Sequence, residues 1–171
     1  MTDRKKVFIL RLINTFIFAF LIAFQYNSVF SIKIQTANPM VTLALLVSVS
    51  IFSSEQTAAF AGMATGIFID CVSNTSSCFH TVLFLCLGLA VSLAAHHLFN
   101  NNIFSACALC FLSSVFYYLL RWVFTYAFSL SFTENLTYLM RIAIPSAVYT
   151  TVFIVPFYYL EKFLYKKFYR I

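Results

Sequence analysis

Charge is scarce in this sequence, which has 5 acidic and 11 basic side chains among 171 residues. Charged residues make up 9% of the chain and apolar residues 62%, and the mean hydropathy is +0.90. A soluble domain usually has about 25% charged and about 45–50% apolar residues. The composition therefore excludes an ordinary soluble domain. It predicts a single transmembrane domain over residues 1–171, with the lipid bilayer rather than nucleic acid as its surroundings.

The motifs that carry common enzyme chemistry are missing as well. The sequence has no Ser-His-Asp order, no HExxH, no phosphate-binding glycine loop and no pair of carboxylates inside an apolar run. His80 and the His96–His97 pair are expected at opposite ends of one helix, which argues against a shared metal site. Cys107 and Cys110 have no histidine or second cysteine pair beside them and are interpreted as small buried apolar residues. We predict a non-enzymatic protein without cofactor or metal.

Long apolar runs recur along the whole chain and predict an all-α, polytopic fold with about six transmembrane helices. A 32-residue run from Pro39 to Asp70 is interrupted by Ser53, Ser54, Glu55 and Gln56. Two helices of about 21 Å each place Glu55 in a tight turn, whereas one long helix would put it near the costly bilayer centre. The predicted spans are residues 7–24, 39–52, 57–70, 79–95, 103–120 and 142–160.

The basic residues gather at the two ends of the chain. Eight of the 11 Lys and Arg residues lie there: Arg4, Lys5, Lys6, Arg11, Lys162, Lys166, Lys167 and Arg170. The positive-inside rule places both ends in the cytoplasm, which requires an even number of spans. We therefore predict a multi-pass membrane protein with its basic ends near anionic lipids at the cytoplasmic face.

Small residues form a ladder in the third predicted span and end on an acid. Residues four apart share one helix face, and small side chains let two helix backbones approach closely in lipid. A second stripe in the fourth span offers an opposing face. Whether these faces pack within the chain or dock a partner is left open by the sequence. The residues are Ala58, Gly62, Gly66 and Asp70 in the third span, and Gly88, Ser92 and His96 in the fourth.

Four charged residues are expected in one layer near the outer surface: Asp70, Arg121, Glu134 and Arg141. We predict that Asp70 pairs with Arg121 or Arg141 and thereby pins the third helix to the last two. The alternative is that the arginines extend to the outer lipid head groups while Asp70 caps a loop.

With these residues, the chain resembles the MreD family of rod-shape-determining proteins. The resemblance rests on Pro39, the apolar run Thr42 to Phe52, the pattern Gly62-x-x-x-Gly66-x-x-x-Asp70 and the span that holds Gly88. It is most specific from Pro39 to Asn102 and elsewhere concerns only length and hydropathy. The chain departs from the family at Met40, where an acidic residue is frequent. It departs again at Ser76, Ser77 and Cys78, where the family often has glycine.

The resemblance implies a non-enzymatic, multi-pass subunit of the bacterial cell-wall elongation machinery, the rod complex or elongasome, in the bacterial cytoplasmic (inner) membrane. This machinery is needed for cell shape and lateral peptidoglycan synthesis. It implies helix–helix docking to the bitopic protein MreC as a direct partner. It further implies membership of one complex with the actin-like MreB, the RodA glycosyltransferase and a class-B penicillin-binding protein.

A second interpretation belongs to a different class of protein. The family's helical architecture is similar to that of the vitamin-binding S components of energy-coupling-factor transporters, which have six spans and a small-residue docking motif in the first. Ala19-x-x-x-Ala23 fits that motif, although alanine pairs are common in apolar helices. An S component needs an outward pocket that desolvates its ligand, and Trp122 with nearby tyrosines offers suitable side chains. Retention of a vitamin, against co-purification with a bitopic partner, separates the two functions.

Overall fold

The computed structural model describes residues 3–26, 40–73, 78–97, 102–125 and 143–169, and every regular element in these ranges is helical. The predicted all-α class is thus confirmed. The helices are α1 (Asp3–Tyr26), α2 (Val41–Phe52), α3 (Glu55–Val72), α4 (Phe79–His97), α5 (Ile103–Thr125) and α7 (Ile144–Tyr169).

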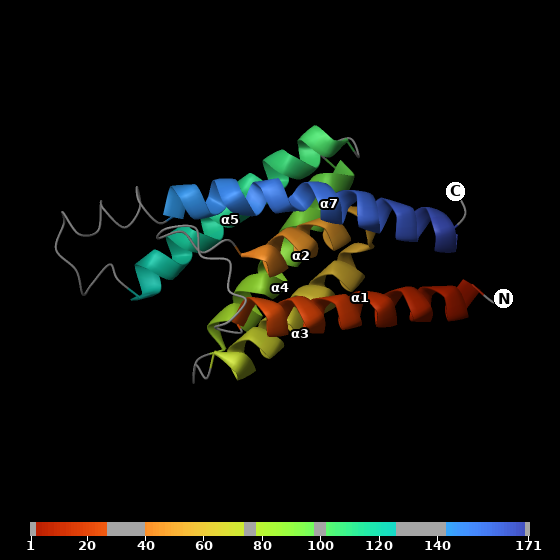
Figure 1. Ribbon diagram of the computed structural model, residues 1–171, viewed down its shortest axis with the longest axis horizontal. Coiled ribbons are helices and arrows are strands. Elements are labelled where there is room, and N and C mark those ends of the chain that lie inside the picture. Colours follow the sequence, from red (N-terminus) through yellow and green to blue (C-terminus); the bar gives the residue numbers. More distant parts are fainter. Residues whose placement is uncertain (1–2, 27–39, 74–77, 98–101, 126–142, 170–171) are drawn as a thin grey trace.

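The short helix α2 forms the centre of the molecule and contacts α1, α3, α4, α5 and α7 (Figure 1). Every residue from Thr42 to Ile51 is buried. The sequence VTLALLVSVSIF is apolar on nearly all sides of the helix. Such a helix is stable only when other helices surround it, as they do here. Its start is joined to α7, because the backbone N–H of Met40 donates to Thr150 Oγ1 at 3.0 Å.

The break between α2 and α3 lies at Ser53 and Ser54, so Glu55 is the first residue of α3. Ser53 Oγ donates to the carbonyl oxygen of Val49 at 2.7 Å. This hydrogen bond serves one of the last carbonyl groups of α2, where hydrogen-bond partners within the helix run out. The sequence placed Glu55 inside the turn, and the structure places it at the start of the next helix. The acid there also complements the positive end of the helix dipole.

Several helices continue beyond the apolar runs that predict them. The largest difference is at α7, which extends to Tyr169, whereas the apolar run ends at Leu160. The hydropathy of a segment marks where the chain prefers lipid, but polar residues with good helix propensity continue the backbone hydrogen bonding past that point. Lys162 and Lys166 therefore lie on α7 rather than in a separate tail.

Among the residues that the structure describes, two helical segments are long and apolar enough to cross a membrane, Phe79–His97 and Ile103–Phe124. The apolar segments Leu12–Gln25 and Val41–Phe52 are shorter. The beginning of α1 and the end of α7, which carry the basic residues of the chain ends, lie at the same end of the molecule (Figure 1).

Candidate functional site

The small-residue stripes of α3 and α4 face one another inside the molecule. A Cβ atom added at Gly62 would overlap the carbonyl oxygen of Phe84, and one added at Gly88 would lie 2.6 Å from the carbonyl oxygen of Ala58. A Cβ at Gly66 would likewise collide with the backbone of Thr81. The two backbones thus touch over three successive positions, with no space for any side chain larger than hydrogen.

Asp70 closes one end of this α3–α4 hairpin. Its Oδ1 accepts from the backbone N–H of His80 at 3.3 Å and lies 2.8 Å from His80 Nδ1. Its Oδ2 accepts from the backbone N–H and the hydroxyl of Thr81 at 2.9 and 2.7 Å. The first N–H groups of a helix have no partner within the helix and favour a negative charge. Asp70 therefore caps α4 from the end of α3.

The burial of this cluster limits what Asp70 can do chemically. Asp70 and His80 are each 9% exposed. Both carboxylate oxygens already accept two hydrogen bonds from α4, which leaves little capacity for a substrate or a metal ion. Tyr117 of α5 also lies near the ring of His80, with 6.2 Å between the ring centroids. The arrangement is that of a structural clasp, a term used below for Asp70 with His80 and Thr81.

A second set of contacts holds the opposite end of the hairpin. Ser92 Oγ donates to the carbonyl oxygen of Ser53 at 3.2 Å, and His96 Nε2 lies 3.0 Å from the same oxygen. His97 Nε2 lies 3.7 Å from Glu55 Oε1, but both side chains are largely exposed. The end of α4 is therefore fastened to the turn between α2 and α3, mainly through the Ser53 carbonyl.

The remaining residues of the predicted charged layer are placed only in part. Arg121 is exposed near the end of α5. Glu134, Arg141 and the turn residue Pro39 lie outside the described residues. Pairing of Asp70 with Arg121 or Arg141 stays a prediction. Within the ranges that the structure describes, no group of three or more His, Cys, Asp or Glu side chains is arranged to hold a metal ion.

Sequence reasoning missed His80 and Thr81 as partners of Asp70. The sequence predicts His80 only as a polar residue near a helix end. A usable signal was present, because an acid that ends one helix lies close to the start of the next when the connection is short. His80 follows Asp70 by ten positions, which meets that condition.

The chain has no match among models of protein families, among curated proteins or among solved structures. The resemblance to the MreD family, which rests on the ladder that ends at Asp70, is therefore a prediction. What the structure contributes is the geometry of that ladder: a close-packed hairpin of two helices with a carboxylate at its end.

Proposed function

We propose that this chain is a non-enzymatic, multi-pass subunit of the bacterial cell-wall elongation machinery, with six transmembrane helices and both ends in the cytoplasm. In this role it binds MreC through its helices and takes part in one inner-membrane complex with MreB, RodA and a class-B penicillin-binding protein. The complex directs lateral peptidoglycan synthesis and so determines cell shape.

The observation that supports this proposal most is the use of Asp70 as a clasp. An intramembrane acid commonly marks a proton path, an ion site or a substrate site. Here both carboxylate oxygens bond to the first turn of α4, and the glycines beside it permit backbone contact. The residues that carry the family resemblance thus build a rigid hairpin, which suits a scaffold subunit.

The partner must then bind elsewhere on the surface, because the small-residue faces of α3 and α4 are buried against each other. Helix α1 offers a suitable stripe of exposed apolar side chains at four-residue spacing. Leu12 is 58%, Phe16 74% and Phe20 64% exposed. A single transmembrane helix of a bitopic protein can cover such a stripe by packing side chains between these residues.

Co-expression tests the proposal. The full chain is produced together with the bitopic, coiled-coil protein of the same host's shape system and purified in mild detergent. We expect the bitopic protein to be retained in equimolar amount. If a charge introduced into the stripe, as in Phe16→Arg, abolishes this retention, the contact lies on the stripe. Phe104→Arg, on the exposed face of α5, is the matched control because Phe104 is 85% exposed. A preparation that retains a vitamin but not the bitopic protein would contradict the proposal and favour an S component.

Depletion in the rod-shaped host provides the test in cells. Loss of the chain should convert rods to spheres, because lateral wall synthesis then stops. Rods that keep their shape and their rate of lateral wall incorporation after depletion would refute the proposed role.

A further inference from the structure

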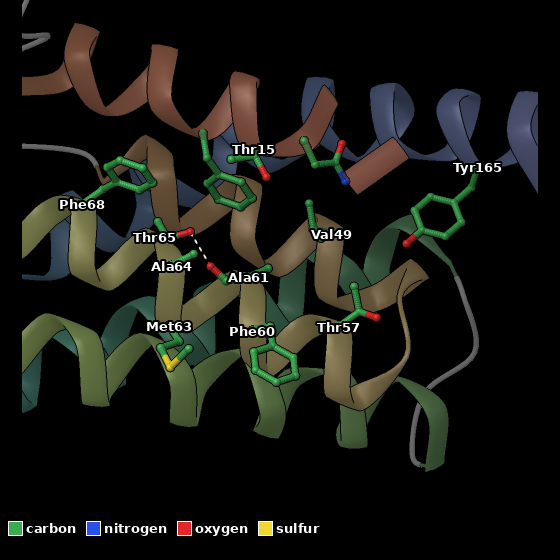
Figure 2. Close-up of a pocket in the computed structure, with 12 residues that line it drawn as sticks. Thr15, Val49, Thr57, Phe60, Ala61, Met63, Ala64, Thr65, Phe68 and Tyr165 are labelled. Atoms are coloured by element: carbon green, nitrogen blue, oxygen red, sulfur yellow. Dashed lines mark hydrogen bonds between the residues drawn. The ribbon is translucent and has the colours of Figure 1, made fainter. Parts of the chain in front are cut away.

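A cavity of about 360 Å³ lies on the side of α3 that faces α1, away from the hairpin. In Figure 2, Phe68 and Tyr165 lie at its opposite ends and Thr57 lies at the Tyr165 end. Most of the lining is apolar, with Phe18, Val49 and Phe60 among the contributing side chains. This volume is within the range of about 300–1,000 Å³ that small-molecule sites occupy.

Two deeply buried polar atoms accompany this cavity and have no hydrogen-bond partner within the described part of the chain. One is Oδ1 of Asn14, a residue that lines the cavity and is 8% exposed. The other is Oε1 of Glu161, which is 0% exposed; Glu161 does not line the cavity and is connected to it through its contact with Asn14. The two side chains meet through a single long hydrogen bond of 3.4 Å from Asn14 Nδ2 to Glu161 Oε2. Buried polar groups are nearly always satisfied, so this pair needs a further partner.

The geometry points to a binding site for a single-chain amphiphile whose head group carries a hydrogen-bond donor. The apolar part of the cavity receives the chain, and the donor is directed to Asn14, the member of the buried pair that lines the cavity. Both unsatisfied atoms are oxygens, which accept hydrogen bonds, so a hydroxyl or ammonium head fits and a head without a donor does not. This inference does not depend on the proposed role in wall synthesis.

The dimensions favour a lipid-like chain over a partner helix inside the cavity. A helix with its side chains is about 10–12 Å across, so it can lie over this opening but cannot enter it. Asn14 lies near the middle of α1, eleven residues past Asp3. It is seven residues past Val7, the first residue of the apolar run, which is about 10 Å along a helix. An amphiphile entering from the membrane surface at the start of α1 would place its head about that far inside, at Asn14, with its chain toward Phe68.

Photolabelling tests the site in the full chain reconstituted in phosphatidylcholine nanodiscs, since that lipid's head group has no hydrogen-bond donor. Two probes of equal chain length carry a diazirine: a fatty alcohol and the methyl ester of the corresponding fatty acid. We expect mass spectrometry to find the label on the α3 segment from Phe60 to Phe68. The alcohol should exceed the ester roughly threefold to tenfold, as one net hydrogen bond allows. A fatty amine as third probe distinguishes the ammonium from the hydroxyl donor.

Three variants complete the test. Ala64→Phe fills the cavity from α3 and should reduce labelling by both probes, whereas Leu112→Phe, on the exposed face of α5, should not. Asn14→Leu combined with Glu161→Met removes the polar pair at similar volume and should abolish only the preference for the alcohol. Equal labelling by alcohol and ester in the wild type would overturn the inference, as would label spread evenly over the lipid-facing helices. Loss of a co-purified protein in Ala64→Phe, with lipid labelling unchanged, would instead make the cavity a protein-docking surface and also overturn it.

Discussion

Helix α3 has two very different sides. Toward α4 it presents Ala58, Gly62 and Gly66, and at the two glycines the backbones touch with no space for a Cβ atom. Toward α1 it presents larger residues such as Phe60, Met63 and Phe68, and a cavity remains. Polar groups follow the same division. Asp70 accepts hydrogen bonds on both oxygens at the hairpin, whereas Asn14, which lines the cavity, keeps an unsatisfied oxygen.

The comparison teaches that small side chains, rather than hydrophobicity, decide how closely two helices of this chain meet. Lipid is as apolar as leucine, so close helix association depends on packing and hydrogen bonds. The contact between α3 and α4 has both close packing and satisfied hydrogen bonds. The contact between α1 and α3 has a cavity and an unsatisfied polar atom. We therefore infer that the hairpin is the rigid part of the molecule. The groove beside α1 is the part that can adapt to a ligand.

The largest effect is expected from Gly62→Ala. Replacing a helical glycine by alanine usually stabilises a helix by about 0.5–1 kcal/mol. Here the new Cβ would overlap the Phe84 carbonyl, so we expect a loss of about 3 kcal/mol or more and poor accumulation of folded protein. The measurement is the free energy of unfolding in mixed micelles. Ala90→Val, on the exposed face of α4, is the control, and a stabilised Gly62→Ala would show that the hairpin is looser than described.

Removing the acid of the clasp should have the next largest effect. Asp70→Ala leaves the N–H groups of His80 and Thr81 without their acceptor, which costs about 1–3 kcal/mol. Asp70→Asn keeps one acceptor oxygen and should lose less. Hydrogen exchange at the first turn of α4 provides a local readout. Unchanged protection there in Asp70→Ala would contradict the capping role.

For Asn14 and Glu161 we expect the double substitution to destabilise the protein less than the single substitution. Asn14→Leu alone leaves Glu161 buried without its hydrogen bond and should destabilise the protein by about 1–3 kcal/mol. Adding Glu161→Met should restore or exceed wild-type stability, since apolar replacements for a poorly satisfied buried polar pair are often neutral or stabilising. The unfolding free energies of both variants check this. A double variant less stable than Asn14→Leu would mean that the polar pair is well satisfied.

The smallest effects are expected at the other end of the hairpin. His96→Ala removes a hydrogen bond to the Ser53 carbonyl, which Ser92 still contacts, so a loss of about 1 kcal/mol or less follows. Glu55→Gln removes the exposed contact with His97 and the charge at the start of α3, so the unfolding free energy should fall by less than about 1 kcal/mol. A large loss in Glu55→Gln would place the main fastening at this end instead.

Much of the helical framework was predictable because apolar runs and their polar interruptions are local features of the sequence. The division of residues 39–70 into two helices follows from Glu55 alone, and the α3 ladder follows from the spacing of Gly62 and Gly66. Helix ends were less predictable, as the continuation of α7 to Tyr169 shows. Hydropathy reports a preference for lipid, whereas helix ends depend on propensity and capping.

The partners of polar residues were the least predictable part. Asn14 and Glu161 are 147 positions apart, and their meeting depends on how α1 and α7 pack, which no local pattern encodes. The sequence directed attention to the arginines as partners of Asp70, because opposite charges attract. The structure shows the start of α4 bound to Asp70, where unpaired backbone N–H groups and the helix dipole favour a carboxylate, and pairing with an arginine stays a prediction.

The central claim, that Asp70 acts as a clasp within the chain rather than as a reactive group, is tested most directly by a double-mutant cycle. Asp70→Ala and Thr81→Val are measured singly and together by unfolding in mixed micelles, since Thr81→Val removes only the hydroxyl that donates to Asp70 at 2.7 Å. We predict a coupling free energy of about 0.5 kcal/mol or more between the two substitutions. Effects that simply add, with no coupling beyond experimental error, would contradict the clasp.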